Sequence, residues 1–331
     1  MRLVRITGAG TGLILEVGHQ LHVIDIVATE PALRSEAPET ARGIHALFQD
    51  PGQSWLPMIS NWADARETLR KLAAIAMDDI RQDRTRLPIH TYEELPLDPP
   101  IPDPGSRIFA MGGNFPAHTS TMGTQMDLPD SVLNGDAGNT PPWGFYVIPG
   151  TIVGTEATIT PPAGTRYLDY EAEVAVVLGA GNHQPGRTAA CIWGYTAWND
   201  FSIRDTALGV SQTDHGPLTW SLTKNFRTGN SCGPWMVVDH PAVDNLSISC
   251  SVNQEVRQRG NTSQMKYSFG RIAAHVSTYI PIGSGDMILS GTPGGTAVES
   301  GPGGPFLRNG DHVTVSVDGI DVLTNRICFT G

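Results

Sequence analysis

Two glutamates stand two residues apart in an otherwise apolar stretch, Tyr167-Leu-Asp-Tyr-Glu-Ala-Glu-Val-Ala-Val-Val-Leu-Gly179. Because side chains alternate between the two faces of a strand, Glu171 and Glu173 are expected on one side, together with Asp169. Carboxylates this close repel one another, and each loses hydration on burial. Both effects are unfavourable unless a nearby cation compensates the negative charge. A hard divalent ion bound by carboxylate oxygens is the simplest such cation. The alternative is an exposed strand face that happens to be acidic.

A third carboxylate lies in the segment Gly194–Asp205, which mixes aromatic and charged residues. Asp200 would complete an oxygen site with the two glutamates, leaving other coordination positions for water or substrate. Arg204 and Asp205 are expected to form a structural ion pair. A direct role in the chemistry is the alternative, and it makes Arg204 a candidate for binding substrate.

Two further segments carry groups suited to anionic oxygens. Lys224 stands alone among apolar and small residues, where it is either a surface lysine or, near a metal, a fixed positive charge for an enolate or a carboxylate. The turn Gly291-Thr-Pro-Gly-Gly295 follows an apolar strand, and the backbone N–H of Gly291 and the Thr292 hydroxyl could hold an anionic group. Turns of this composition are common, so this signal is weak.

A histidine follows the Gly-Gly turn of the segment Phe109–His118. Imidazole exchanges protons near neutral pH, as metal-assisted chemistry on a carbonyl requires, so His118 is a candidate acid/base. The alternative is a hydrogen-bonded structural histidine. The polar stretch 119–142 is expected to form a mobile flap over a pocket.

Composition excludes several classes of protein. The 331 residues are 40% hydrophobic and carry a formal charge of -11, and no Lys/Arg-rich run is present to bind nucleic acid. No apolar run approaches the roughly 20 residues that span a bilayer, and the strand-like start shows no secretory signal. The four cysteines are widely separated and are expected to be reduced and mostly buried, so we expect a cytoplasmic protein with no membrane partner.

Residues 1–95 are expected to form a small amino-terminal domain. Strands are predicted at Arg2–Ile6, Leu13–Leu15 and Leu21–Ile26, followed by a helix over residues 62–84. The buried stripe of that helix is predicted to be Leu69, Leu72, Ala73 and Met77. Residues 96–104 are a Pro-rich connector, which is the best domain boundary in the sequence.

Strands dominate residues 105–331, and this pattern predicts an α+β domain of packed or rolled antiparallel sheets. Only two helices stand out, around residues 186–198 and 268–279. The predicted strands are 107–111, 151–159, the Glu171 strand, 233–238, 247–252, 287–290 and 312–317.

Five segments, in order, resemble the fumarylacetoacetate hydrolase (FAH) family over roughly residues 105–331. They are Gly-Asn-Phe-x-x-His118; Asp169-Tyr-Glu-Ala-Glu173; Gly194-Tyr-Thr-x-x-Asn-Asp200 with Ser-x-Arg-Asp205; Lys224-x-Phe ahead of Gly-Pro-Trp235; and Gly285-Asp-Met-Ile-Leu-Ser-Gly-Thr-Pro-Gly294. The first hundred residues resemble the variable amino-terminal domain of longer members.

The resemblance implies a mixed β-sandwich roll with a small α/β amino-terminal domain, assembled as a homodimer. It implies that Glu171, Glu173 and Asp200 bind Mg²⁺, or Mn²⁺ or Ca²⁺ in its place. Lys224 and Thr292 would hold substrate oxygens, and His118 would be the acid/base. Family substrates are mostly small 1,3-dicarbonyl compounds or 2-oxo acids.

Three positions depart from the family pattern. Thr121 stands where many members have a glutamate three residues after the histidine, and Phe145–Pro149 is apolar where many bacterial relatives have a lysine. Arg227 replaces a frequent aspartate, which makes it a candidate for binding substrate and alters the charge that the pocket presents.

The first hypothesis is a Mg²⁺-dependent hydrolase that cleaves a carbon–carbon bond in a 1,3-dicarbonyl or acylpyruvate-like substrate through an enolate stabilised by the ion. The second hypothesis is an enzyme that forms the same enolate but converts it to other products, as a hydratase, decarboxylase or tautomerase of a 2-oxo acid. Thr121, in place of the usual glutamate, favours this hypothesis. The third is a family member that binds a ligand without turnover.

Overall fold

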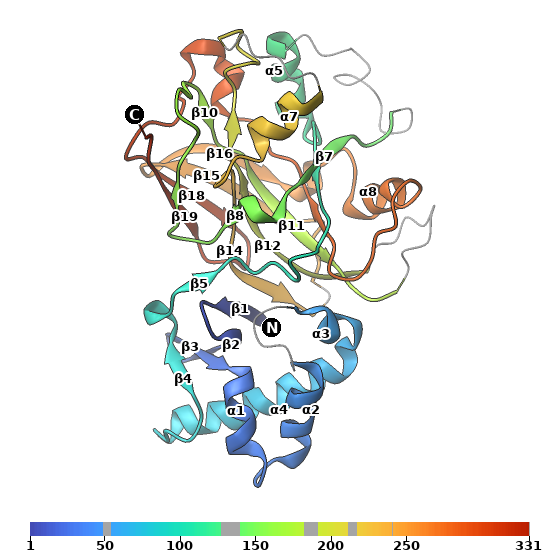
Figure 1. Cartoon of the computed structure of the whole chain (residues 1–331), viewed down its shortest axis with the longest axis vertical. Coiled ribbons are helices and arrows are strands. Elements are labelled where there is room, and N and C mark those ends of the chain that lie inside the picture. Colours follow the sequence, from blue (N-terminus) through green and yellow to red (C-terminus); the bar gives the residue numbers. More distant parts are fainter. Residues whose placement is uncertain (49–53, 127–139, 182–190, 211–216, 240, 331) are drawn as a thin grey trace.

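The computed structural model describes residues 1–48, 54–126, 140–181, 191–210, 217–239 and 241–330. Most described strands belong to two sheets, and most strand pairs are antiparallel. The helices of the amino-terminal segment form the lower part of the view in Figure 1, whereas α5 and α7 lie at the opposite end of the long axis. This mixed α+β architecture of large sheets and few helices confirms the predicted fold class.

The larger sheet has 12 strands and joins the amino-terminal segment to the rest of the chain. Its main path is, in order, β4 (Ile89–Thr91), β3 (Gln20–Asp25), β2 (Gly10–Val17), β1 (Arg2–Ile6), β14 (Asn230–Val238), β12 (Ile192–Asp200), β11 (Ala172–Leu178), β17 (Met287–Leu289), β6 (Ile108–Met111) and β7 (Gly144–Val147). Off this path, β5 (Leu97–Asp98) pairs with β1 and β8 (Ile152–Val153) pairs with β14.

A five-stranded sheet and a two-stranded pair complete the β structure of the described residues. The strand order in the five-stranded sheet is β16 (Glu255–Asn261), β15 (Ser247–Val252), β18 (His312–Val317), β19 (Leu323–Ile327) and β9 (Thr158–Ile159). The two-stranded pair joins β10 (Leu168–Asp169) to β13 (Ser202–Ile203). The helices are α1 (Ile26–Leu33), α2 (Pro38–Leu47), α3 (Leu56–Ser60), α4 (Trp62–Arg81), α5 (Pro116–Met126), α7 (Pro217–Lys224) and α8 (Phe269–Val276). Short 3-10 helices are η1 (Tyr92–Glu94), η2 (Pro149–Thr151), η3 (Thr262–Gln264) and η4 (Ala297–Gly303).

Strand β11 is buried on both faces because it lies between two hydrophobic cores. Val174 and Val176 belong to the core that also contains side chains of the five-stranded sheet. Ala175 and Val177 belong to the core that contains the apolar side chains of α4. The sequence of a strand that is buried on both faces is a continuous apolar run, and residues 174–178 form such a run. The alternation along β11 also places Glu173, its second residue, on the same face as Ala175 and Val177.

The predicted helix around residues 186–198 is wrong for the described part, since Ile192–Asp200 form strand β12. This strand pairs with β11 on one side and β14 on the other, and nearly all of its side chains are buried. A run buried on both faces has no polar positions that would reveal its period, and its aromatic and β-branched residues favour a strand. Residues 186–190 lie outside the described part of the chain.

The predicted strands at both ends of the chain, Arg2–Ile6 and His312–Val317, are confirmed with the same limits. The helix predicted over residues 62–84 is α4, but its buried face differs. Leu69 and Leu72 are fully buried, whereas Ala73 and Met77 are only partly buried, and Ala65 and Ala76 complete the face instead. The segment 151–159, predicted as one strand, is a 3-10 turn and two short strands, β8 and β9.

The start of the predicted flap is helical, because residues 119–126 belong to α5. Residues 127–139 lie outside the described part of the chain. The four cysteines are free thiols as predicted, although only Cys232 and Cys250 are fully buried and Cys328 is exposed. Within the described ranges, no helix has both the length and the apolar composition needed to cross a membrane.

The amino-terminal segment and the connector take part in the large sheet. Arg2 and Leu3 pair with Val237 and Met236 of β14, and β5 of the connector pairs with β1. The domain limits at residues 95 and 104 remain a prediction.

Candidate metal centre

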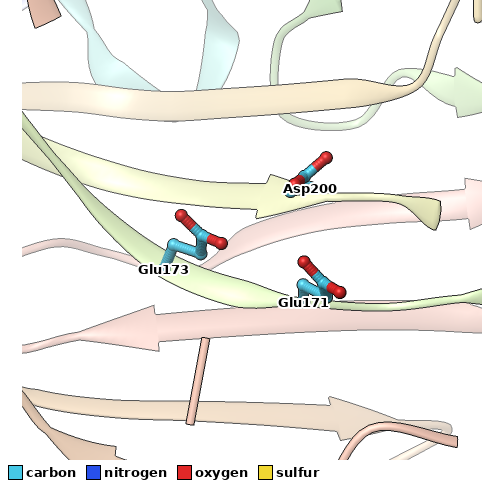
Figure 2. A group of neighbouring side chains, drawn as sticks. All are labelled: Glu171, Glu173 and Asp200. Atoms are coloured by element: carbon cyan, nitrogen blue, oxygen red, sulfur yellow. The ribbon is translucent and has the colours of Figure 1, made fainter. Parts of the chain in front are cut away.

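Three buried carboxylates converge at the ends of two neighbouring strands (Figure 2). Glu171 immediately precedes β11, Glu173 is its second residue, and Asp200 is the last residue of β12. One oxygen of each lies within 4.8 Å of the others, and the residues are 6%, 1% and 1% exposed. This burial excludes the exposed acidic strand face, and the cluster could bind a divalent metal ion.

The strand pairing brings these residues together. Ala172 pairs with Asn199, and beyond that pair the Asp200 N–H donates to the Glu171 carbonyl at 3.0 Å. The Asn199 side chain accepts from the Glu171 N–H at 3.0 Å. Backbone geometry therefore fixes the spacing between the carboxylates from β11 and the one from β12.

Two buried cations contact the cluster. Lys224 Nζ, at the end of α7, donates to Glu171 Oε2 at 2.6 Å and to Asp200 Oδ2 at 2.8 Å. Arg204 forms ion pairs with Glu171 and Asp169, the latter at 3.1 Å from its Nε. Lys224 is therefore not a surface lysine, and its ammonium lies 5.6 Å from the centre of the Phe145 ring.

The predicted ion pair between Arg204 and Asp205 is wrong. Asp205 instead accepts the backbone N–H groups of Arg166 and Tyr167, at 3.0 and 3.1 Å. By accepting two backbone N–H groups, the Asp205 carboxylate stabilises the turn that contains them. The Arg204 side chain points towards the interior instead.

Asp169 does not belong to the three-carboxylate cluster, contrary to the expectation that it projects beside the glutamates. The strand is interrupted between β10 and β11, which breaks the alternation. Its oxygens accept from the backbone N–H groups of Ala297 and Val298, at 2.8 and 3.1 Å, as well as from Arg204. Asp169 therefore anchors η4 and orients Arg204.

Full ionisation of the carboxyl groups in this buried region would leave an excess of two negative charges. Glu171, Glu173, Asp200 and Asp169 would then carry four, and Lys224 and Arg204 offset two of them. Asp200 Oδ1 is buried and has no hydrogen-bond partner. Buried charge and a buried orphan acceptor are both costly, and one divalent cation would satisfy both. The all-oxygen donor set fits a hard ion.

The pKa values of the carboxyl groups diverge strongly. Burial raises the pKa of Glu171, but the charges of Lys224 and Arg204 outweigh it and bring that pKa to about 2. Burial and the charges of Asp200 and Glu171 raise the pKa of Glu173 well above its usual value. Burial, opposed by Lys224 but reinforced by Glu171, raises the pKa of Asp200 to about 7. Without a cation, protons therefore compensate the excess charge.

Metal binding is expected to release protons and to strengthen as pH rises. The pKa of Asp200 is raised to about 7 and that of Glu173 well above its usual value, which favours their protonated forms, and a metal ion must displace such protons to bind the carboxylates. We expect a positive number of protons released per Mg²⁺ bound at pH 7. Calorimetric titrations in buffers of different ionisation enthalpy measure this number. An affinity that is flat between pH 6 and 8 would contradict the assignment.

The Gly-Thr-Pro-Gly-Gly turn lies against the same strand, and its polar groups are used within the protein. The Gly291 N–H donates to Glu173 Oε2 at 3.1 Å, so the anionic group that it holds is a carboxylate of the cluster. The Thr292 hydroxyl donates to the Ala172 carbonyl at 3.1 Å and accepts from Gln258 at 2.8 Å. Both residues position β11 in this structure.

His118 lies in the first turn of α5 and is nearly buried. Its Nδ1 lies 2.6 Å from Glu299 Oε1, in η4, and the ring is close enough to Glu171 that a positive charge on it would lower the pKa of that carboxyl group. The predicted acid/base candidate is therefore near the carboxylates. Arg227, in contrast, has an exposed side chain, and among the described residues no hydrogen bond or ion pair joins it to the cluster.

Sequence reasoning missed Glu299 and Gln258. Gln258 bonds both to the Ala172 N–H, at 3.0 Å, and to Thr292, so it fixes the turn against the strand. Glu299 is 181 residues from His118 in the chain, and no local pattern connects them. The only available signal was a lone glutamate in a Gly-rich segment that follows the turn.

Comparison with known proteins places the residues of this centre in a matched region of the chain. Residues 107–328 match the sequence model described as "Fumarylacetoacetate (FAA) hydrolase C-terminal". The chain is 29% identical over 334 residues to "Oxaloacetate tautomerase FAHD2A, mitochondrial" of Bos taurus, covering 99% of this chain and 91% of that protein. It is 30% identical over 246 residues to "Oxaloacetate tautomerase YisK" of Bacillus subtilis, covering 72% of this chain and 75% of that protein.

A similar solved structure is 5-carboxymethyl-2-hydroxymuconate delta-isomerase from Mycobacterium smegmatis. It is 25% identical, the match covers 100% of both chains, and the TM-score is 0.64. The family match covers the residues that build the cluster, the lysine and the histidine. The chain therefore belongs to the fumarylacetoacetate hydrolase family.

Proposed function

We propose that this chain is a Mg²⁺-dependent enzyme that moves a proton between carbon and oxygen of a 2-oxo acid, as a tautomerase or isomerase. The observation that carries the proposal is the His118–Glu299 pair beside a buried cluster of three carboxylates and a lysine. The tautomerase and isomerase among similar proteins support it, since they favour the second hypothesis of the sequence analysis over hydrolysis.

Glu171, Glu173 and Asp200 would hold the ion, which would act as a Lewis acid on the adjacent oxygens of the substrate. Mg²⁺ suits an all-carboxylate site, and Mn²⁺ and Ca²⁺ are the alternatives. A 2-oxo acid offers two neighbouring oxygens that match such a site. We expect the small molecule to be the main partner and the enzyme to be a homodimer in the cytoplasm.

The chain's own groups account for the proton transfer. His118 would remove a proton from the carbon beside the carbonyl, the C–H electron pair would form the carbon–carbon double bond, and the carbonyl pair would move to oxygen. Lys224 would offset the negative charge that develops there, and Phe145, over the ammonium, would limit access of water. Returning the proton to oxygen completes the isomerisation.

Hydrolysis of a carbon–carbon bond is retained as the second candidate, because Glu299 gives His118 a carboxylate partner. The lack of a glutamate at position 121 was the feature that disfavoured hydrolysis, and Glu299 offsets that lack. The same pair could activate a water molecule that attacks a carbonyl carbon.

Product analysis in D₂O distinguishes these functions. Incubation of 2-oxo acids, including oxaloacetate, and of 1,3-diketones with enzyme and Mg²⁺ is followed by proton NMR. We expect faster exchange of the protons beside the carbonyl than with a His118→Asn variant, without new fragments. Two fragments would show hydrolysis. Thermal stabilisation by a 2-oxo acid with no exchange and no consumption would instead show a binding protein and overturn the proposal.

A further inference from the structure

Helix α5 is held so that its first turn faces η4. The Thr119 hydroxyl bonds to the carbonyls of Gly113 and Phe115, at 3.1 and 3.0 Å, which fixes the start of the helix. A Cβ added to Gly294 would lie 3.6 Å from the Ala117 Cβ, so the helix packs against the Gly-rich turn at contact distance. The position of His118 relative to η4 is therefore determined by packing.

The carboxylate of Glu299 is itself held by three donors. Oε1 lies 2.6 Å from His118 Nδ1 and accepts from the Thr296 hydroxyl at 3.2 Å, while Oε2 accepts from the Gly295 N–H at 3.0 Å. The side chains of His118 and Glu299 are only 10% and 13% exposed. Burial alone would raise the pKa of Glu299, but the bonds from His118 and Gly295 lower it, so the group is ionised at neutral pH.

An ionised carboxylate can only accept hydrogen bonds, so the short contact requires a proton on His118 Nδ1. In neutral imidazole the other nitrogen, Nε2, then carries the lone pair. The Thr121 hydroxyl donates to the Ala117 carbonyl within the same helix, whereas Glu299 contacts Nδ1 directly. The partner of the histidine thus comes from a segment far away in the chain.

We propose that Glu299 is the positioning residue that fixes the tautomer of His118 and so makes Nε2 the atom that accepts and returns the substrate proton. The proton-transfer part rests on the proposed function, whereas the tautomer does not. When Nε2 takes a proton, the resulting imidazolium lies beside a nearly buried carboxylate and is stabilised by a charge-assisted hydrogen bond.

The isosteric variant Glu299→Gln gives a sharp test. The Gly295 N–H can only donate, so the glutamine carbonyl oxygen must face it, and the NH₂ group must then face His118 and Thr296. An NH₂ group that donates to Nδ1 needs a lone pair on that nitrogen. The single ring proton of neutral imidazole must then lie on Nε2. The variant should therefore invert the tautomer.

Nitrogen-15 NMR of the metal-free protein reads the tautomer directly. The chain has 10 histidines, so the His118 signals are assigned by their loss in His118→Asn. We expect an Nδ1–H tautomer in the wild type and an Nε2–H tautomer in Glu299→Gln. An Nε2–H tautomer in the wild type overturns the proposal even if the variant does not fold.

Kinetics supply the second readout. We expect Glu299→Gln to lower kcat by about 10²-fold or more, with KM within about threefold, because a positioned acid/base contributes about 10²–10⁴-fold. The matched control is Thr296→Val, which removes a bond to the same carboxylate oxygen but keeps the histidine contact. It should keep the wild-type tautomer and a kcat within about threefold.

The outcomes separate this inference from the proposed function. A wild-type protein that turns over no 2-oxo acid refutes the proposed function, while its NMR spectrum still decides the role of Glu299. Unchanged kcat in Glu299→Gln, or an equal loss in Thr296→Val, would show that Glu299 only supports the loop.

Discussion

Asparagine in place of Asp200 is expected to abolish stabilisation by Mg²⁺ and to lower kcat by about 10³-fold or more, since several kcal/mol of charge stabilisation is lost. Asp200 contributes a buried oxygen, Oδ1, that has no hydrogen-bond partner, and asparagine replaces the anionic ligand with a neutral amide. Thermal unfolding with and without saturating Mg²⁺ measures binding, because a ligand that binds only the folded state raises Tm.

The metal-free variant should be at least as stable as the wild type at pH 8. The pKa of Asp200 is raised to about 7 in the fold, above the unfolded value, so its ionisation destabilises the metal-free protein as pH rises through about 7. Asparagine does not ionise. The matched control is Asp205→Asn, which loses bonds to backbone amides but no metal ligand and should keep Mg²⁺ dependence. Mg²⁺-dependent turnover by Asp200→Asn at the wild-type rate would refute the site.

Replacement of His118 by asparagine should lower kcat by about 10²–10⁴-fold while leaving Mg²⁺ binding intact, because the histidine acts on the proton and not on the ion. Its Nδ1 bonds to Glu299, and no metal ligand is among its hydrogen-bond partners in the described part of the chain. Steady-state kinetics and the Mg²⁺-induced rise in Tm measure the two effects separately.

The control for this variant is Ser120→Ala, two residues further along the same helix turn. Ser120 is exposed, and within the described ranges its hydroxyl bonds to the Ala117 carbonyl alone, so kcat should stay within about twofold. If His118→Asn retained wild-type kcat, the proton would have to move by another group. If it lost Mg²⁺ binding as well, the histidine would belong to the metal site.

Much of the centre could be predicted from sequence because local rules determine it. The spacing of Glu171 and Glu173 indicated that their side chains lie together, and Asp200 was proposed from its place in a segment rich in aromatic and charged residues. The pairing of β11 with β12, which brings Asp200 to the glutamates, was not predicted. The prediction that Asp169 projects beside the glutamates was wrong, because the strand is interrupted between β10 and β11. Nothing in the apolar sequence marks that interruption. The predicted ion pair between Arg204 and Asp205 was also wrong. Asp169 and Glu171 lie beside the Arg204 guanidinium instead.

The remaining errors concern contacts between distant segments. β12 was predicted as helical because burial on both faces removes the polar positions that reveal a period. The joining of β1 to β14 unites residues more than two hundred positions apart, and single-sequence periodicity cannot show that pairing. Glu299 is the same kind of case, since only tertiary packing places it against His118.

The most direct measurement of the metal centre is anomalous diffraction from crystals soaked with Mn²⁺. The account predicts one strong peak about 2.0–2.3 Å from an oxygen of each of Glu171, Glu173 and Asp200. A peak elsewhere, or crystals that take up Mn²⁺ without density between these three carboxylates, would contradict it.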